Sequence, residues 1–308
     1  MSAALGRPKQ ARAPSGGKKF PVGIVGTGNM GGGMARNLLA RGWPVHVHDV
    51  DGGKTENLKV FGAYAHANAE KVAINSGVLI VCVVDAAQTR EVLFGADGAA
   101  AALAPGRAVM LCPTIAPSDV ESIAQALVEL GLHTVDAPMS GGPVRAQDGS
   151  MSLMVACADA VFDAHRGLIE ALSSKVFRIS ERVGDGARTK LVNNLLAGIN
   201  LVGAAEALAL AARMGLDLTT TLDVMQQSSG QSWIGEDRLR RAIAGDYAPR
   251  AHTTLLAKDT RLAIEAAADL GFAPALGAQA STTFWRAIEQ GLGGEDDASV
   301  FKLLRKIG

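Results

Sequence analysis

The 308-residue sequence is poor in cysteine, in aromatic residues and in unbalanced charge. Its three cysteines, Cys82, Cys112 and Cys157, lie far apart and form no CxxC pair, which argues against a disulfide framework and predicts free thiols. Lys plus Arg equals Asp plus Glu at 30 each, and aromatic residues make up 4 %, so we expect no nucleic acid as a partner. No apolar run reaches the roughly 18 residues of a membrane span, so we expect no membrane contact. The six histidines are scattered, so we expect no metal site. Free thiols are typical of a reducing compartment, so we expect a cytoplasmic protein.

Residues 1–19 contain five basic residues and no acidic one. They lack the apolar stretch of a secretory signal peptide. A mitochondrial transit peptide has a similar composition, but we favour a disordered basic tail.

The first half of the chain alternates short apolar runs with helical patterns. The run VLIVCVV at 78–84 has no polar alternation, as expected for a strand that is covered on both faces. Strands that alternate with helices favour right-handed crossovers and a parallel sheet. The expected strands are 22–25, 45–48, 78–84, 108–111, 134–136, 152–156 and 176–179, and the expected helices between them are 30–40, 68–75, 88–94, 117–130 and 161–172.

The second half shows only helical periodicity. Residues 186–214 read as one long helix without proline, which would extend about 43 Å. We therefore predict an α/β domain with a parallel sheet followed by an all-α domain, joined through this long interdomain helix. The predicted parts are a disordered basic tail at 1–19, the α/β domain at 20–183 and the α-helical domain at 184–308.

The sequence GTGNMG at 26–31 follows an expected strand and opens an expected helix. Glycine inside a helix costs about 1 kcal/mol relative to alanine, so these glycines need a compensating role. In a dinucleotide fold the first glycine permits a tight turn, the second admits the pyrophosphate and the third lets helix and strand pack closely. The helix N-terminus offers free N–H groups to the phosphates. We therefore predict a cofactor loop formed by Gly26, Gly28, Asn29, Met30 and Gly31.

Asp49 lies 18 residues beyond Gly31, at the expected end of the second strand. A carboxylate at this place accepts hydrogen bonds from the ribose hydroxyls and repels the 2′-phosphate of NADP. NAD is therefore the expected cofactor, and NADP is less favoured. The alternative is a solvated loop acid at Asp49, with Asp51 in its place.

A second unusual segment, DAPMSGGP, follows the strand expected at 134–136. Successive backbone N–H groups and the hydroxyl at Ser140, Gly141 and Gly142 form a nest that suits a carboxylate. The segment lies at the carboxyl end of the sheet, where open α/β folds bind ligands. On its spacing alone, an ordinary turn is the alternative.

A third segment, GDGARTKLVNN, opens the long helix. Lys190 and Asn194 are four residues apart and so share one helix face. The rest of the helix is almost entirely apolar or small. Lys190 is therefore either a snorkelling surface lysine or a buried functional one.

Together these segments show that the sequence resembles the β-hydroxyacid dehydrogenase family from Phe20 to the C-terminus. The motifs that carry the resemblance are GTGNMGGGMARNL, DAPMSGG, GDGARTKLVNN and the Lys-Asp pair in AKDTRLA, in the family's order. The resemblance implies an α/β Rossmann-type dinucleotide-binding domain, which is the NAD-binding domain at 20–183, joined through the long interdomain helix to an all-α domain. It also implies that this α-helical domain at 184–308 serves as substrate and oligomerisation domain and forms homodimers or homotetramers. The site residues that it implies are Lys190 as the catalytic lysine, Asn194 and Ser140–Gly142 as substrate ligands, Thr114 beside the nicotinamide, Lys258 closing the cofactor site and Asp259 as a structural neighbour.

The sequence departs from the family's commoner pattern after Met30, where three glycines follow. We expect this triplet to loosen the start of the helix without preventing phosphate binding.

The implied chemistry is hydride transfer between nicotinamide C4 and the carbinol carbon of a short acid. Lys190 is the expected general acid and base, without a metal. Its pKa must fall from about 10.4 to near 7 to 8, and burial can supply that shift. We expect residues 226–233, which are rich in hydroxyls and amides, to complete the pocket and to favour a polyhydroxylated acid over a methyl-bearing one. A solvated helix end is the alternative for this segment.

The favoured activity is therefore an NAD-dependent tartronate semialdehyde (2-hydroxy-3-oxopropionate) reductase or glycerate dehydrogenase, with a small hydroxy acid or semialdehyde as substrate. L-Threonate dehydrogenase and 3-hydroxyisobutyrate dehydrogenase are the alternatives. The chain length argues against a decarboxylating 6-phosphogluconate dehydrogenase, and the presence of Lys190 argues against an imine reductase. A non-catalytic NAD-binding module is the alternative of a different class.

Overall fold

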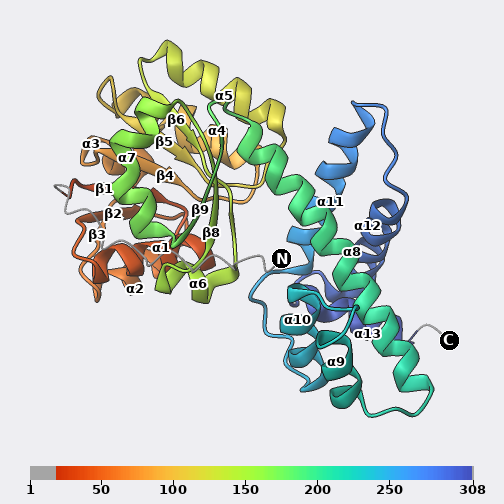
Figure 1. The fold of residues 1–308 in the computed structure, drawn as a ribbon. Helices are drawn as coiled ribbons and strands as arrows, with labels where there is room; N and C mark the ends of the chain where they lie inside the picture. The colour runs from red at the N-terminus through yellow and green to blue at the C-terminus, as the bar shows by residue number, and fades with distance from the viewer. Residues whose placement is uncertain (1–18, 307–308) are drawn as a thin grey trace, which may run out of the picture.

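The computed structural model describes residues 19–306, and it places a sheet with flanking helices beside a group of packed helices (Figure 1). The basic tail predicted at 1–19 lies outside the described residues, apart from Lys19. The sheet and its helices form a Rossmann-type fold, and an all-helical part follows it in the chain, as predicted.

The sheet has the strand order β3-β2-β1-β4-β5-β6-β8-β7, with β9 paired to β8. The strands β1 to β6 run parallel, whereas β8 runs antiparallel to β6 and parallel to β9. The strands are β1 (Val22–Val25), β2 (Val45–His48), β3 (Tyr64–Ala65), β4 (Val78–Val81), β5 (Ala108–Leu111), β6 (His133–Asp136), β7 (Met139–Ser140), β8 (Ser152–Ala156) and β9 (Lys175–Ser180). The prediction of a strand over 78–84 was too long, because Cys82 and the residues after it turn towards the glycine loop and line a cavity.

Helices cover both faces of the sheet, so each face has its own apolar core. One core packs under α1, α6 and α7, and the other packs under α3, α4 and α5. These helices are α1 (Asn29–Ala40), α2 (Gly52–Lys59), α3 (Ala69–Ile74), α4 (Ala86–Phe94), α5 (Pro117–Glu129), α6 (Gly142–Asp148) and α7 (Asp159–Leu172). The prediction missed α2 and α6, and it treated the start of α6 as a turn.

The helical part is built around α8 (Asp185–Arg213), which runs from the sheet into the middle of the other helices (Figure 1). By length and composition, α8 is the one helix in residues 19–306 that could cross a membrane, but Leu201, Ala205 and Leu208 of this helix are buried in the third core. The remaining helices are α9 (Leu218–Gln226), α10 (Trp233–Ile243), α11 (Thr253–Ala268), α12 (Ala275–Ala287), a π-helical turn (Ile288–Leu292), the 3-10 turn η3 (Asp297–Ser299) and α13 (Val300–Lys306).

A buried carboxylate fixes the start of α8 against the sheet. Asp136, the last residue of β6, accepts hydrogen bonds from the backbone N–H groups of Gly184 at 2.8 Å and Ala187 at 3.1 Å. These N–H groups belong to the first turn of α8, which has no partner for them within the helix. The contact therefore holds the first two turns of α8, including Lys190, at the carboxyl end of the sheet.

Candidate active site

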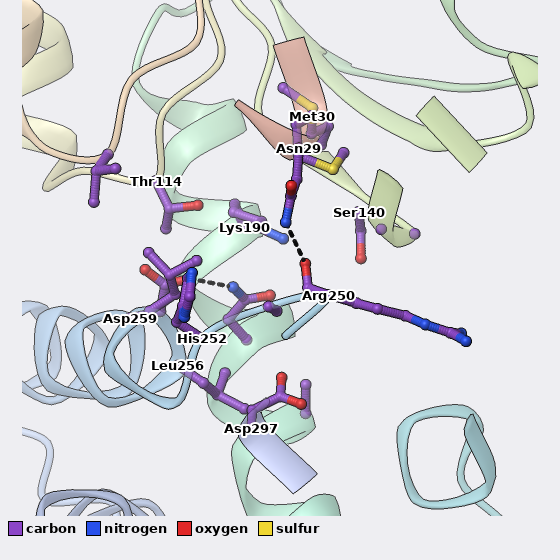
Figure 2. Close-up of a pocket in the computed structure, with 18 of the residues that line it drawn as sticks. Asn29, Met30, Thr114, Ser140, Lys190, Arg250, His252, Leu256, Asp259 and Asp297 are labelled. Carbon is purple, nitrogen blue, oxygen red and sulfur yellow. Dashed lines mark hydrogen bonds between the residues drawn. The ribbon is translucent and has the colours of Figure 1, made fainter. Parts of the chain in front are cut away.

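A cavity of about 640 Å³ lies between the carboxyl end of the sheet and the helical part (Figure 2). Figure 2 shows Lys190 between Thr114 and Ser140, with His252, Leu256 and Asp297 contributed by the helical part. The predicted site residues that line the cavity are Gly28, Asn29, Met30, Gly31, Thr114, Ser140, Gly141, Gly142, Lys190, Asn194 and Lys258. Gly26 and Asp49 do not line it.

The glycine loop has the geometry that a dinucleotide requires. Gly26 has a φ of +90°, and a Cβ there would lie 2.4 Å from the carbonyl oxygen of Cys82. A Cβ at Gly31 would lie 1.9 Å from the carbonyl oxygen of Gly26, so helix and strand can approach only without a side chain. A Cβ at Gly28 would meet no atom within 4 Å. The second glycine therefore faces open space at the start of α1, where a pyrophosphate fits.

Asp49 closes the turn after β2. Its Oδ2 accepts the backbone N–H of Thr27 at 2.7 Å and its Oδ1 accepts that of Asp51 at 2.9 Å. Lys54 Nζ lies 3.6 Å from Oδ1. Asp51 has a different role, because its side chain caps α2 through the N–H of Gly53. Asp49 is therefore anchored beside the glycine loop, while Asp51 stabilises a helix end.

The glycine triplet after Met30 lies within the first turns of α1, which begins at Asn29. That the triplet loosens this start stays a prediction. Gly33 faces α6, where an added Cβ would lie 3.0 Å from Cβ of Ala146 and 3.1 Å from the carbonyl oxygen of Pro143. The absence of a side chain at Gly33 lets α6 cross close to α1. This crossing fixes the segment that leads into α6, which is the predicted carboxylate loop.

The carboxylate loop joins a strand to a short helix. Ser140 pairs with Ser152 in the sheet, and Gly141 and Gly142 follow with φ values of +129° and +77°. Side chains rarely adopt this conformation, which explains why both positions are glycine. A Cβ at Gly142 would meet no atom within 4 Å. The loop thus presents the Gly142 backbone and the Ser140 side chain to the cavity, while the side chain of Arg145 packs against Gly141.

Lys190 is a buried lysine, since it is 7 % exposed. It is therefore not a snorkelling surface residue. Burial lowers the pKa of Lys190 to about 8, the charge of Asp259 opposes this shift, and the charge of Lys258 adds to it. A lysine with this pKa can both accept and donate a proton near neutral pH.

A chain of hydrogen bonds connects the two sides of the cavity. Asn194 Nδ2 donates to Asp259 Oδ2 at 2.6 Å, and Lys258 Nζ donates to Asp259 Oδ1 at 2.7 Å. Lys258 Nζ also donates to the carbonyl oxygen of Thr114 at 2.5 Å, which crosses from α11 to the sheet. Asp259 therefore lines the cavity and links two predicted site residues, Asn194 and Lys258. In the sequence, only its position next to Lys258 indicated that Asp259 belongs to the site.

A second contact between the two sides lies at the glycine loop. Asn29 Nδ2 donates to the carbonyl oxygen of Arg250 at 3.2 Å (Figure 2). Arg250 and His252 belong to the segment before α11, and both line the cavity. Sequence reasoning missed this segment, because it carries no motif.

The helical end of the cavity differs from the prediction. Within 226–233 only Trp233 lines the cavity, and Gln226 is buried, where its Oε1 accepts the N–H of Ser232 at 3.2 Å. The polar lining contributed by the helical part includes Arg238 on α10 and Asp297 in η3. Residues 19–306 contain no group of three His, Cys, Asp or Glu side chains arranged to hold a metal ion.

Comparison with known proteins identifies both halves of the chain. The family model of the NAD binding domain of 6-phosphogluconate dehydrogenase matches residues 21–180. The model described as NAD-binding of NADP-dependent 3-hydroxyisobutyrate dehydrogenase matches residues 184–304. The L-threonate dehydrogenase of Escherichia coli strain K12 is 39 % identical, over 94 % of this chain and 97 % of its own length.

Solved structures show the same arrangement. The crystal structure of 3-hydroxyisobutyrate dehydrogenase from Salmonella typhimurium superimposes with a TM-score of 0.87 at 40 % identity, and covers 92 % of this chain and 100 % of that one. Psf3 in complex with NADP+ and 2-OPP superimposes with a TM-score of 0.85 at 29 % identity, and covers 92 % and 99 % of the two chains.

Proposed function

The chain belongs to the β-hydroxyacid dehydrogenase family, and from this premise we propose that it is an NAD-dependent dehydrogenase of L-threonate or a closely related sugar acid. The family membership makes it an NAD(P)-dependent oxidoreductase that acts on CH–OH groups. The likeness to L-threonate dehydrogenases supports threonate better than tartronate semialdehyde, which the residues alone favoured. The choice of substrate remains our proposal.

The cofactor side of the cavity suits a dinucleotide. The open face of Gly28 and the N–H groups at the start of α1 would hold the pyrophosphate, and Asp49 would accept the ribose hydroxyls. When bound, the cofactor supplies a hydride acceptor or donor at nicotinamide C4. Thr114 and the ammonium of Lys258, which donates to the Thr114 carbonyl, would border the nicotinamide.

On the substrate side, the backbone and hydroxyl of Ser140–Gly142 would hold the carboxylate and so fix which carbon faces the nicotinamide. In the oxidative direction, the neutral amine of Lys190 accepts the proton of the reacting hydroxyl. In the reductive direction, its ammonium donates a proton to the carbonyl oxygen. Asn194, which Asp259 holds in place, would bond the same oxygen or its neighbour.

The observation that carries the proposal is the buried Lys190, with a pKa of about 8, in a cavity that it shares with the carboxylate loop. Burying a lysine in this way opposes folding, since the charged form loses its hydration. A module that only binds NAD does not require a buried lysine with a lowered pKa. Perturbed ionisable groups in a cavity are typical of active sites.

Initial rates of the purified protein with a panel of acids test the proposal. L-Threonate, D-glycerate and 3-hydroxyisobutyrate are supplied with NAD or NADP, and tartronate semialdehyde with NADH or NADPH. We expect the highest kcat/KM for L-threonate with NAD. Faster turnover of tartronate semialdehyde would replace the proposed substrate, and NAD binding without turnover of any acid would favour a non-catalytic module. Homodimer or homotetramer formation stays a prediction, which sedimentation velocity tests.

A further inference from the structure

A buried ion pair forms one end of the substrate cavity. Arg238 on α10 is 7 % exposed and Asp297 in η3 is 3 % exposed, and both line the cavity. Arg238 Nε donates to Asp297 Oδ1 at 2.5 Å. In Figure 2, Asp297 lies at the lower end of the cavity beyond Leu256, and Met30 of the cofactor loop lies at the upper end. Asp297 therefore lies at the end of the cavity away from Met30, and we assign this end to the substrate.

The ion pair belongs to a larger cluster with two halves. Asp296 is completely buried, and its Oδ2 accepts the backbone N–H of Arg250 at 2.8 Å and Arg241 Nη1 at 3.1 Å. Arg241 and Asp296 do not line the cavity, so this half holds the segment before α11 in place. Arg238 and Asp297 form the half that reaches the cavity.

Atoms of the cavity half remain open to a ligand. Among the described residues, Arg238 Nε and Nη1 have carboxylate partners, whereas Arg238 Nη2 has none. The carboxyl group of Asp297 also contacts that of Asp296. Buried side-chain nitrogen and oxygen atoms without a partner occur, within 19–306, only at Thr134, His165 and Gln226. Arg238 Nη2 is therefore not sealed in the interior, and both side chains line the cavity. The pair presents a guanidinium donor beside a carboxyl group.

The charge of the cluster defines what these atoms can bind. The guanidinium groups of Arg238, Arg241 and Arg250 face four carboxylates, those of Asp237, Asp246, Asp296 and Asp297. Carboxylates therefore outnumber guanidinium groups in the cluster, which disfavours a second carboxylate or a phosphate there. A hydroxyl group suits the site, because it donates to the carboxylate and accepts from the guanidinium at the same time. Burial raises the pKa of Asp297 to about 7, and its protonated form can also donate to a hydroxyl.

We propose that Arg238 and Asp297 determine substrate specificity by binding the hydroxyl group farthest from the carboxylate of a polyhydroxylated acid. This inference rests on the proposed dehydrogenase function and deepens it. With the carboxylate at Ser140–Gly142 and the reacting carbon at Lys190, the remaining hydroxyls would extend towards α10 and η3, which line the same cavity. An acid that carries a methyl group there leaves both buried polar side chains without a partner, and such sites reject the analogue strongly.

The test compares two substrates that differ in one hydroxyl. L-Threonate and 2,3-dihydroxybutanoate of the same configuration differ only at C4, and their kcat/KM ratio measures recognition of that hydroxyl. Because hydrogen bonds to charged groups contribute about 1.5–3 kcal/mol, the wild-type ratio should be roughly 10- to 150-fold in favour of threonate. Asp297→Asn, which keeps the shape of the side chain, should reduce the ratio several-fold.

A double variant, Arg238→Met with Asp297→Leu, removes both partners together, which avoids an unpaired buried charge. The ratio should then approach one. Arg241→Lys is the matched control, because it alters the same cluster outside the cavity and should leave the ratio unchanged. Far-ultraviolet circular dichroism and NAD binding verify that each variant is folded.

The outcomes separate the inference from the proposed function. A wild-type ratio near one, or an equal loss of activity on both substrates in Asp297→Asn, would overturn the inference and leave the dehydrogenase intact. The second result would show that the pair is merely structural. A wild type that prefers 3-hydroxyisobutyrate, or turns over no hydroxy acid, would overturn the proposed function and the inference with it.

Discussion

Asn194 donates a hydrogen bond from Nδ2 to Oδ2 of Asp259 at 2.6 Å, which joins α8 to α11 beside the cavity. The other oxygen of this carboxylate accepts Lys258 Nζ at 2.7 Å. The charge of Asp259 also raises the pKa of Lys190 and so opposes the effect of burial. One carboxylate thus positions a substrate ligand and adjusts the proposed acid and base.

Asp259→Asn should shift the pH dependence of oxidation. Oxidation needs the neutral amine of Lys190, so the wild-type rate should rise with pH through about 8. Without the negative charge, the pKa of Lys190 falls further, and the rise should occur at a lower pH. The measurement is kcat/KM for L-threonate against pH, with Asp185→Asn as a control on the same helix. A rise at unchanged or higher pH would contradict this role of Asp259.

Lys190→Met should stabilise the protein at neutral pH. The pKa of Lys190 is about 8 in the folded state and about 10.4 in the unfolded state. Below pH 8 the lysine is protonated in both states, and its charge destabilises the folded state most. This destabilisation decreases as the pH rises from 8 to 10.4 and vanishes at higher pH. From the difference in pKa, its size is about 3 kcal/mol. Urea titrations at pH 7 and pH 10.5 measure the free energy of unfolding, and an equal effect of the variant at both pH values would contradict the account.

Gly28→Ala should weaken NAD binding without affecting the fold. A Cβ at this position meets no protein atom within 4 Å, so the cost must arise from the cofactor. We expect the Kd for NAD to rise roughly tenfold or more, since the backbone approaches the pyrophosphate here. Gly167→Ala, where a Cβ likewise meets nothing within 4 Å, is the control. Unchanged NAD affinity in Gly28→Ala would show that the cofactor lies elsewhere.

Asp49→Asn should reduce the preference for NAD over NADP. The amide can still accept the N–H of Thr27, but it loses the charge that binds the ribose hydroxyls and repels a 2′-phosphate. The ratio of kcat/KM for the two cofactors should fall roughly tenfold or more. Asp51→Asn removes an equal charge from the cap of α2 and should leave the ratio nearly unchanged. A wild type that prefers NADP would contradict the role of Asp49 at once.

The sequence predicted those parts of the fold that depend on local pattern. The buried strands Val22–Val25 and Ala108–Leu111 are uninterrupted apolar runs, so their bounds were predicted to the residue. The glycine loop could be predicted because each glycine follows from a steric requirement. Helix α2 could not, because its sequence GGKTENLK has little apolar periodicity and is held by the cap of Asp51.

The parts of the site that depend on tertiary packing could not be predicted. Arg238 and Asp297 are 59 residues apart, and they meet because α10 and η3 pack side by side. Asp136 was recognised as part of a motif, but its contact with the first turn of α8 depends on the placement of that helix against the sheet. Similarly, the polar segment at 226–233 was assigned to the pocket on composition, whereas the fold places most of it elsewhere.

The most direct test of the central claim is the turnover of Lys190→Met with NAD and L-threonate at pH 8. The account predicts a loss of roughly 10²- to 10⁴-fold in kcat with NAD affinity retained, because the general base is removed and the cofactor loop is untouched. Lys71→Met, at an exposed position on α3, should leave kcat unchanged. A Lys190→Met protein that oxidises threonate as fast as the wild type would contradict the account, since the buried lysine would then have no part in the chemistry.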